Sequence, residues 1–459
     1  MSFHSGRLLE LVKKYNVPGP RYTSYPTALQ FTEEYDRSLL TEHFNNRATS
    51  KTDLSLYIHI PFCFSLCWFC GCTKVITKDQ NRGDLYLDYL DKEMKLVNET
   101  IHPESTVKQI HFGGGTPTFL TPDQLQRLGN IIKKHFYIHE DVEFSVEIDP
   151  RRVEENHIKA LKDIGCNRAS LGVQDTNEVV QKAIHRIQPF EQTFKITELL
   201  RKHGIQNINI DLIYGLPKQT LDLFRKTIDD VMRLDPDRFA IYSYAHLPSI
   251  MPAQRLLNEA DFPSTEEKLG MLVYAINKLP DFGYKYIGMD HFAKEEDELS
   301  LALQNGSLQR NFQGYSTRAE LDMIGLGMSG ISQFDSVYTQ NEKDLECYYQ
   351  MIDDGKLPIK KVLQLSDEDK LRRAVIMQIM CKGELKYSQF LDENPEYFKN
   401  KFSDELHQLK LLESDGLISL HNNGFSITQT GRLFLRNIAM VFDEYLKQKT
   451  HQTAYSKTV

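Results

Sequence analysis

A repeated order of short β-rich runs and helical patterns is the feature of this sequence that most constrains its fold. Helical patterns at Pro122–His135, Phe190–His203 and Gln219–Leu234 separate several of the runs, and Thr121 followed by Pro122 gives the first helix a clear start. Strands that alternate with helices in this way indicate βαβ units and a parallel sheet. The predicted strands are Leu54–Ile60, Val107–Phe112, Glu143–Ile148, Arg168–Val173, Asn207–Ile213, Arg238–Tyr244 and Tyr284–Met289.

These strands carry polar side chains on one of their two faces. Tyr57 and His59 alternate with apolar neighbours in the first strand, as do Ser145 and Glu147 in the third and Asp211 in the fifth. Helices then cover the apolar face, and the polar face lines an interior that holds a sizeable polar ligand. Because a closed β/α barrel fills its interior with branched apolar side chains, we predict an incomplete, three-quarter parallel β/α barrel. An antiparallel sheet with one solvated face is the alternative.

Past Tyr315 the alternation of strands and helices fades, and the rest of the chain is predicted to be rich in helix. A short hairpin, Leu417–Thr428, interrupts it, with Asn422, Asn423 and Gly424 at the turn. The predicted helices are Leu371–Met380, Tyr397–Asp415 and Gly431–Lys447. This pattern is similar to a winged helix, but the net charge of −8 favours a packing or lid role over DNA binding.

The predicted organisation has three parts. They are an N-terminal arm (residues 1–50), a catalytic β/α barrel with substrate-covering loops (51–360) and a small α-rich C-terminal domain (361–459). The first residues lack the apolar run of a secretory signal, and no run of about 18 apolar residues occurs anywhere. We therefore expect a cytoplasmic protein without membrane insertion.

Four of the seven cysteines lie within the ten residues from Cys63 to Cys72. An odd cysteine count in a chain without a signal argues against a disulfide framework, and such crowding in a reducing compartment points to metal or cluster binding. Cys63, Cys67 and Cys70 form a C-x3-C-x2-C motif directly after the first predicted strand.

Thiolates suit both zinc and iron–sulfur clusters. Three thiolates on a four-iron cubane leave the fourth iron free to bind a ligand. Structural zinc takes four ligands, commonly in two paired knuckles, and no second C-x2-C follows downstream. The motif therefore favours a [4Fe–4S] cluster. The run Gly113–Pro117 ends the second strand, where barrel ligands bind and where glycines let the backbone approach a ligand.

The cysteine motif and the glycine run resemble those of the radical S-adenosylmethionine (SAM) superfamily. The resemblance implies that the open iron binds the amino and carboxylate groups of SAM. The reduced cluster then cleaves SAM to methionine and a 5′-deoxyadenosyl radical, which removes a hydrogen atom from the substrate.

Further segments are similar to one family within that superfamily, the oxygen-independent coproporphyrinogen III oxidases of haem biosynthesis. The likeness extends from about Tyr15 into the C-terminal part. The segments that carry it are Gly19–Pro26, Tyr57–Cys63, Cys70–Cys72, Val146–Pro150, Gly172–Asp175, Asp211–Pro217, Tyr244–Pro248, Gly288–Ala293 and Arg310–Tyr315.

This likeness implies an anaerobic oxidative decarboxylation. Two propionate groups of coproporphyrinogen III become vinyl groups with loss of two CO₂, and protoporphyrinogen IX forms. The implied partners are a reduced flavodoxin- or ferredoxin-like electron donor and an unknown electron acceptor, and we expect a monomer that binds no nucleic acid.

The resemblance also assigns site residues. Cys63, Cys67 and Cys70 hold the cluster, and Tyr57, Glu147 and Gln313 are the catalytic candidates. The positions expected to contact the cluster-bound SAM are Tyr57, Gly114, Glu147 and Ile331. Those expected to contact a second SAM, an unusual feature of this family, are Phe69, Gly115, Thr116, Gln174, Arg186, Asp211 and Ala245. From the residues alone, Glu147 and Asp211 could instead be satisfied lumen residues and Arg186 a surface charge.

The cysteine loop also contains Cys72 and Trp68. Cys72 lies close enough to compete as a fourth ligand, but the family has it without using it as one, so we expect a supporting role. Trp68, the only tryptophan, stands where the family usually has a tyrosine. We expect its emission to be quenched when the cluster assembles.

The substrate's propionates need cations or hydrogen-bond donors, for which the candidates are Arg21, Tyr22, Tyr25, Arg310 and Gln313. We hypothesise that the arm covers the site and orders around the substrate; simple packing on the barrel is the alternative. Haem-delivering radical SAM relatives are the competing class, but they generally lack the Gly19–Pro26 arm and the full second-SAM set. A tRNA-modifying enzyme would need a basic RNA-binding domain, which the charge balance does not indicate.

Overall fold

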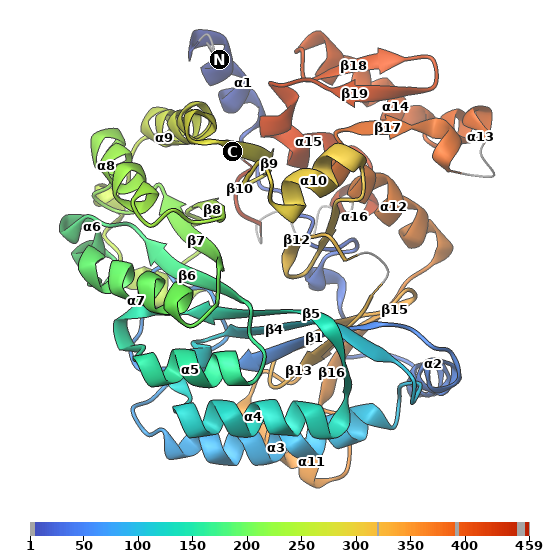
Figure 1. Cartoon of the computed structure of the whole chain (residues 1–459). Coiled ribbons are helices and arrows are strands. Elements are labelled where there is room, and N and C mark those ends of the chain that lie inside the picture. The colour runs from blue at the N-terminus through green and yellow to red at the C-terminus, as the bar shows by residue number, and fades with distance from the viewer. Residues whose placement is uncertain (1–4, 319–320, 391–393, 448–454, 459) are drawn as a thin grey trace.

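The computed structural model describes residues 5–318, 321–390, 394–447 and 455–458. Its central element is a twelve-stranded sheet whose middle section is parallel (Figure 1). The strands of this section are, in spatial order, β13 (Asp322–Leu326), β1 (Leu54–Ile60), β4 (Thr106–Gly114), β5 (Tyr137–Ile148), β6 (Arg168–Gln174), β7 (Asn207–Tyr214) and β8 (Arg238–Ser243). The parallel pairing confirms the βαβ prediction and rules out the antiparallel alternative.

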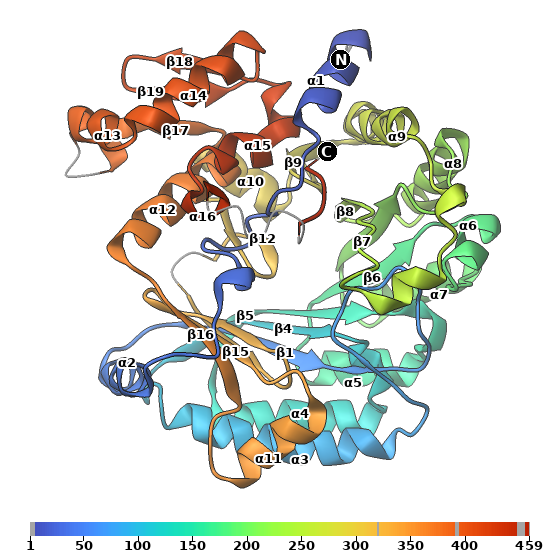
Figure 2. The same cartoon turned by 180° about the vertical axis from the view of Figure 1, so that it is seen from behind.

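Helices cover the outer face of the parallel strands (Figures 1 and 2). They are α3 (Asn81–Asn98), α4 (Pro122–His135), α5 (Glu155–Asp163), α6 (Glu178–Ala183), α7 (Phe190–Lys202) and α8 (Leu221–Met232). Helix α4 begins where predicted, because the Thr121 hydroxyl accepts from the Gln124 amide while the Gln124 side chain accepts from the Thr121 amide. Its residues Leu125, Leu128 and Ile132 are buried in the core between helix and sheet.

Both ends of the sheet are antiparallel and they do not pair with each other. At one end β10 (His291–Lys294) pairs with β8 and with β9 (Tyr284–Gly288); at the other, β14 (Ile331–Gln333), β15 (Val337–Asn341) and β16 (Ile359–Gln364) follow β13. The barrel is therefore incomplete, as predicted. The strand predicted at Tyr284–Met289 forms but is not parallel, because a two-residue turn joins it to β10.

The expectation that strands fade after Tyr315 is wrong for Asp322–Gln364, where β13 to β16 extend the sheet. Several of these strands have only three to five residues, too few to show an alternating pattern. A separate hairpin, β11 (Gln309–Asn311) and β12 (Gly314–Ser316), precedes them. The helices in this part of the chain are α9 (Thr265–Lys278), α10 (Glu298–Asn305) and α11 (Leu345–Asp353).

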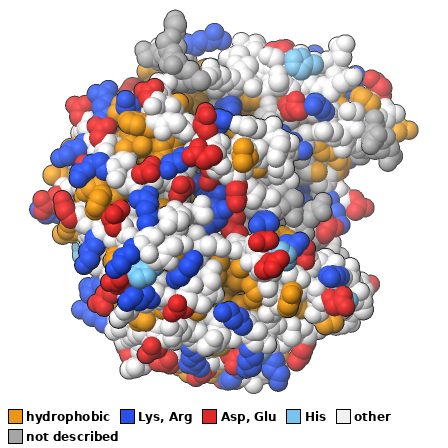
Figure 3. All heavy atoms as spheres, in the orientation of Figure 1, with side chains coloured by type: hydrophobic (Ala, Val, Ile, Leu, Met, Phe, Trp, Pro, Cys, Tyr) orange, Lys and Arg blue, Asp and Glu red, His pale blue; other side chains and the backbone are white. Residues whose placement is uncertain are grey.

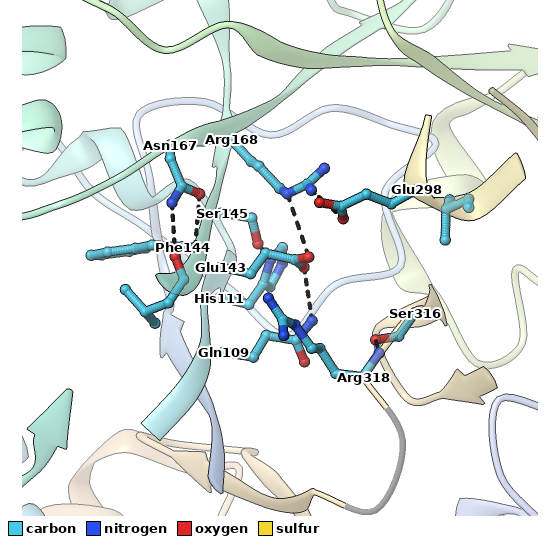
Figure 4. A network of polar contacts seen from close by, with 12 residues as sticks. Gln109, His111, Glu143, Phe144, Ser145, Asn167, Arg168, Glu298, Ser316 and Arg318 are labelled. Atoms are coloured by element: carbon cyan, nitrogen blue, oxygen red, sulfur yellow. Dashed lines mark hydrogen bonds and ion pairs between the residues drawn. The ribbon is translucent and has the colours of Figure 1, made fainter. Parts of the chain in front are cut away.

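Polar side chains line the inner face of the barrel, as the alternation predicted. A chain of contacts crosses three neighbouring strands (Figure 4): Gln109 donates to Glu143 over 2.9 Å, and Arg168 lies 3.4 Å from the same carboxylate. Arg168 also pairs with Glu298 of α10 at 2.6 Å. The charges of Arg238 and Arg318 also act on Glu143, so three arginines from different parts of the chain reach this network.

The C-terminal part combines helices with a small sheet of β17 (Glu384–Lys386), β18 (Ile418–His421) and β19 (Gly424–Ile427). The predicted hairpin turn is confirmed, and α12 (Asp367–Lys382) contains the predicted first helix. The second predicted helix is divided at Phe402 into α13 (Pro395–Lys401) and α14 (Ser403–Ser414). The last one is divided into a 3₁₀ turn, α15 (Leu435–Met440) and α16 (Glu444–Lys447), because Asp443 caps the amide of Tyr445.

The N-terminal arm lies between the barrel and the C-terminal part (Figure 2). It contains α1 (Ser5–Tyr15) and α2 (Arg37–Thr49), and α1 shares one apolar core with α12, α14 and α15. The exact domain boundaries stay a prediction. On the face in Figure 3, basic and acidic side chains are interspersed. No helix in the described ranges is long and apolar enough to cross a membrane.

Candidate active site

The three motif cysteines line one cavity of about 700 Å³ at the carboxyl ends of the barrel strands. Strand β1 leads through Pro61 into β2 (Phe62–Cys63), which pairs with β3 (Val75–Ile76) and so closes the cysteine loop. Cys63 and Cys67 are buried, Cys70 is half-buried and Cys72 is exposed. The loop therefore presents its thiols to the interior of the barrel.

Two arginines approach the sulfur of Cys67. Arg151 Nη2 lies 3.4 Å and Arg186 Nη1 3.5 Å from the sulfur, and both guanidinium groups also bind the carboxylate of Asp149. Burial opposes ionisation of Asp149, but Arg186 and Arg151 outweigh it and lower its pKa to about 2. Two guanidinium groups therefore direct N–H donors at the Cys67 sulfur. Asp149 and Arg151 lie beside the strand that carries Glu147, but we did not single them out from the sequence.

The other thiols differ in their surroundings. Burial raises the pKa of Cys63 to about 11, although its sulfur also lies 3.4 Å from the Thr116 hydroxyl. A hydrogen bond with Cys72 lowers the pKa of Cys70 to about 6. The supporting role of Cys72 stays a prediction. A bound metal removes the proton from such thiols.

The residues present fit an iron–sulfur cluster. No three His, Cys, Asp or Glu side chains of the described ranges are gathered closely enough to hold a single metal ion; thiolates of a cubane each bind a different iron. The glycine run packs tightly on the cysteine loop, since a Cβ on Gly115 would lie 2.5 Å from the carbonyl oxygen of Pro61. Gly114 has φ +112°, and a Cβ there would meet the His59 ring. A side chain at either glycine would therefore displace the cysteine loop or the His59 ring.

Three of the four positions assigned to the cluster-bound SAM lie together. Glu147 accepts from the Gly114 amide over 3.2 Å, and the Tyr57 ring stacks on His111, which lies 3.3 Å from Glu147. Burial and then the charge of Glu147 raise the pKa of Tyr57, so its hydroxyl stays a donor. Ile331 on β14 instead lines a neighbouring cavity of about 410 Å³ with arm residues.

Most positions assigned to a second SAM also line the 700 Å³ cavity; these are Phe69, Gly115, Thr116, Gln174, Arg186 and Asp211. Arg186 is 6% exposed, so it is not a surface charge. Burial raises the pKa of Asp211 to about 6 despite hydrogen bonds from Ser170 and Asn209. Ala245 lines an adjacent cavity, but Gln254 donates to the carbonyls of both Ala245 and Phe69 over 3.1 Å and so ties the two edges together.

The substrate candidates are not among the residues that line the 700 Å³ cavity. Arg310 is buried, donates to the carbonyl oxygens of Tyr22 and Arg21, and has no partner for its Nη1 among the described residues. Gln313, in the turn between β11 and β12, likewise has an unpartnered Nε2. The Tyr22 hydroxyl donates to Asp443 over 2.8 Å, and the Tyr25 hydroxyl accepts from the amide of Glu444. Both tyrosines therefore face the C-terminal part.

An incomplete parallel barrel with a three-thiol loop at the carboxyl end of its first strand defines a radical SAM protein. Residues 57–231 match the family model of the radical SAM superfamily, and residues 365–434 match that of the HemN C-terminal domain.

Relatives cover nearly the whole chain. Oxygen-independent coproporphyrinogen III oxidases from Pseudomonas aeruginosa and Helicobacter pylori strain J99 are 44% and 46% identical, over 96% and 95% of this chain and 97% and 96% of their own lengths. The solved structure of coproporphyrinogen III oxidase (HemN) from Escherichia coli, described as a radical SAM enzyme, matches with a TM-score of 0.89 and 41% identity. The match covers 95% of this chain and 98% of the HemN chain. The chain belongs to the family of oxygen-independent coproporphyrinogen III oxidases.

Proposed function

We propose that this chain oxidatively decarboxylates coproporphyrinogen III to protoporphyrinogen IX without oxygen. The observation that carries the proposal is the single cavity in which Cys63, Cys67 and Cys70 face Glu147 and Asp211. It joins a thiolate set for a cluster to carboxylates that accept from amino and hydroxyl groups. The relatives' names and their nearly full-length identity support the same reaction.

One [4Fe–4S] cluster with three cysteine ligands and two SAM molecules are the cofactors that we propose. When bound, they supply a one-electron cleavage of SAM whose 5′-deoxyadenosyl radical removes a hydrogen from the carbon β to a propionate carboxylate. Tyr57, Gly114, Glu147 and Ile331 bind the cluster-bound SAM. The second SAM is bound by Phe69, Gly115, Thr116, Gln174, Arg186, Asp211 and Ala245.

The protein's own side chains bind and orient the cofactors and the substrate. Arg151 and Arg186 donate to the Cys67 sulfur, and Asp149 fixes both guanidinium groups. Glu147, held by the Gly114 amide, accepts from the amino group of a bound ligand. Tyr57 donates its hydroxyl proton in a hydrogen bond without losing it, and Gln313 offers its unpartnered amide nitrogen to the substrate.

The haem-delivering class is not favoured. Its members generally lack the Gly19–Pro26 arm, which here is built into the fold: Arg436 donates to the carbonyl oxygens of Gly19 and Pro20. We further propose a cytoplasmic monomer that takes electrons from a reduced flavodoxin- or ferredoxin-like donor and passes the substrate's remaining electron to an external acceptor.

Anaerobic turnover tests the function. Protein reconstituted with iron and sulfide is given a reductant, SAM, coproporphyrinogen III and an electron acceptor, and the products are analysed by mass. We expect a SAM-dependent loss of two CO₂. The variant Cys63→Ser should lose the cluster and all detectable turnover, whereas Cys347→Ser, at an exposed position on α11, should keep both. An intact cluster that cleaves SAM but leaves the substrate unchanged with several acceptors contradicts the proposal.

A further inference from the structure

A second cavity of about 400 Å³ lies beside the active-site cavity, between the barrel and both chain ends. Its walls come from the ends of β7 and β8, from α9, from the N-terminal arm and from residues 455–457 near the C-terminus. Residues Val12 and Asn16 and residues 455–457 line this cavity together with residues of α9. We call it the Lys268 cavity, defined by Arg21, Tyr214, Ala245, Lys268 and Lys457.

The Lys268 cavity carries positive charge without carboxylates. Among the described residues that line it are Arg21, Lys268 and Lys457, and none is Asp or Glu. His246, at its edge, pairs with the exposed Glu259 at 3.2 Å. Arg21 pairs with Asp290, which belongs to the barrel interior. The two lysines have no ion pair within the described ranges, so the net charge of the cavity is positive.

Lys268 is held in place although no acidic side chain of the described residues neutralises it. Its methylene groups cover Gly215, where a Cβ would lie 2.7 Å from the Lys268 Cε; Gly215 also has φ +84°. Its Nζ donates to the carbonyl oxygen of Tyr244 at 3.5 Å. Burial, followed by the charge of Lys457, lowers the pKa of Lys268 to about 8. A partly buried ammonium without an anion is costly to the free protein, and an anionic ligand offsets that cost.

The Lys268 cavity adjoins the active-site cavity along the same two strands. Asp211 and Tyr242 line the active-site cavity, and Tyr214 and Ala245 line the Lys268 cavity three residues further along. Three residues of strand span about 10 Å. Arg21 lies between the two, with its guanidinium 5.4 Å from the centre of the Tyr242 ring. Because side chains alternate along a strand, Tyr214 points to the face opposite that of Asp211 and packs on Phe224. The link between the two cavities is therefore Arg21, which lines the Lys268 cavity and packs on Tyr242 of the active-site cavity, so a macrocycle bound beside Arg21 can reach both.

We propose that the Lys268 cavity is a carboxylate subsite, in which Lys268 and Lys457 bind a propionate of the porphyrinogen that does not react. The inference rests on the proposed function and assigns a place to part of its substrate. Anchoring this propionate aligns the macrocycle so that another propionate lies near Asp211 and Tyr242. Lys268 is thus a positioning residue, and its loss weakens substrate binding more than it slows the chemical step.

The test compares Lys268→Met, which keeps an apolar stem, with Lys278→Met in the last turn of the same helix. Lys278 pairs with Asp281 at 3.4 Å on the surface. Loss of one charge-assisted contact should raise KM for coproporphyrinogen III about tenfold, with kcat, iron content and KM for SAM little changed. Lys278→Met should stay within about twofold of wild type, and Lys268→Arg should restore most of the affinity.

Binding is also measured without turnover, by absorbance titration with coproporphyrin III, the stable oxidised macrocycle, and with its tetramethyl ester. Lys268→Met should weaken binding of the acid about tenfold and leave ester binding unchanged. Equal affinity for the acid in wild type, Lys268→Met and Lys268→Gln overturns the inference.

A rise in KM for SAM alone also overturns the inference, because the cavity then holds the carboxylate of SAM. If wild-type protein turns over normally and Lys268→Met binds coproporphyrin III as tightly as wild type, the subsite is refuted but the function is not. Wild-type protein that neither binds nor converts the substrate refutes both. If Lys268→Met fails to fold, Lys457→Met provides the test from an exposed position, with an expected loss of about threefold.

Discussion

Charged groups on the two sides of the barrel interior are neutralised in different ways. On the cysteine side, Asp149 lies between Arg151 and Arg186, so each buried charge has an opposite partner within the protein. On the arm side, Arg436 binds only carbonyl and hydroxyl oxygens, and Lys268 has no carboxylate among the described residues. The cysteine side is thus preorganised without a ligand, whereas the arm side keeps a surplus of positive charge for a substrate that carries several carboxylates.

The largest effect on stability is expected from removing one of the paired charges on the cysteine side. Arg186→Met removes a cation from the buried Asp149 and should lower the free energy of unfolding of the cluster-free protein by about 3–5 kcal/mol. Chemical denaturation measures the change. Lys182→Met breaks only the exposed pair with Glu178 on α6 and should cost about 0.5 kcal/mol or less.

This effect should also depend on pH. The pKa of Asp149 is lower in the folded protein than in the unfolded chain, so its stabilisation is present above about pH 4 and is lost as the pH falls toward 2. The difference between wild type and Arg186→Met should therefore shrink in acid. A difference that is the same at pH 3 and pH 7 would show that Asp149 is not the group being paired.

Glu93 is a buried carboxyl group that accepts hydrogen bonds from three neutral donors of the described residues. Its carboxylate accepts from the Gly327 amide, the Asn341 side chain and the Tyr348 hydroxyl at 2.7–2.8 Å. Burial outweighs these hydrogen bonds and raises its pKa from 4.5 to about 7. The folded state then holds a proton that the unfolded chain releases, so stability should fall by up to about 3 kcal/mol between pH 4.5 and 7.

The variant Glu93→Gln cannot ionise and should lose this dependence on pH, whereas Glu99→Gln, at an exposed position after the same helix, should keep it. Denaturation midpoints between pH 4.5 and 7.5 provide the measurement. Parallel curves for wild type and Glu93→Gln would mean that Glu93 stays ionised, and the three donors would then suffice without a cation.

A smaller effect is expected on the arm side. Arg436 is 5% exposed and donates to the carbonyl oxygens of Gly19, Pro20, Ser456 and Lys457. Arg436→Met leaves these acceptors unpaired, but it also removes a cation whose burial, followed by the charge of Arg21, lowers its pKa to about 9. The two effects oppose each other, so we expect a loss of about 2 kcal/mol.

Limited proteolysis provides a second measurement for Arg436→Met, because the freed arm should be cut first near Gly19. Lys410→Met, at an exposed position on α14, should match wild type in both assays. A loss as large as that of Arg186→Met would contradict the comparison, since it would mean that Arg436 is as well compensated as the cations beside Asp149.

The cysteine side could be predicted from the sequence because its signals are local. The motif follows the first strand directly, and polar alternation marks Tyr57, Glu147 and Asp211 as interior residues. The pairing of Arg186 with Asp149 could not be predicted, since it depends on how the loop after β6 returns over the barrel. No local pattern around Arg186 or Asp149 indicates that their side chains pair.

The arm side could be predicted only in part. Gly19–Pro26 was recognised by resemblance, but its packing depends on residues from the other end of the chain. Tyr22 and Tyr25 lie in the core that α1 shares with α12 and α15, so deletion of residues 1–26 would remove core side chains as well as any cover over the site. The Lys268 cavity likewise joins three distant segments, and no local pattern marks Lys268 or Lys457.

The smallest effect is expected from Trp68, at the edge of the cysteine side. Its ring stacks on His185 at 5.1 Å with an angle of 13° between the planes, and its backbone amide donates to Ile184. The packing therefore does not need the indole nitrogen, and Trp68→Tyr should change kcat by about twofold or less.

In wild type, tryptophan emission should fall as iron and sulfide are added, because the only tryptophan stands next to the proposed ligand Cys67. The variant Cys63→Ser, treated identically, is the control. Equal emission from cluster-free and reconstituted wild-type protein would place the cluster away from this loop and remove the basis for contrasting the two sides.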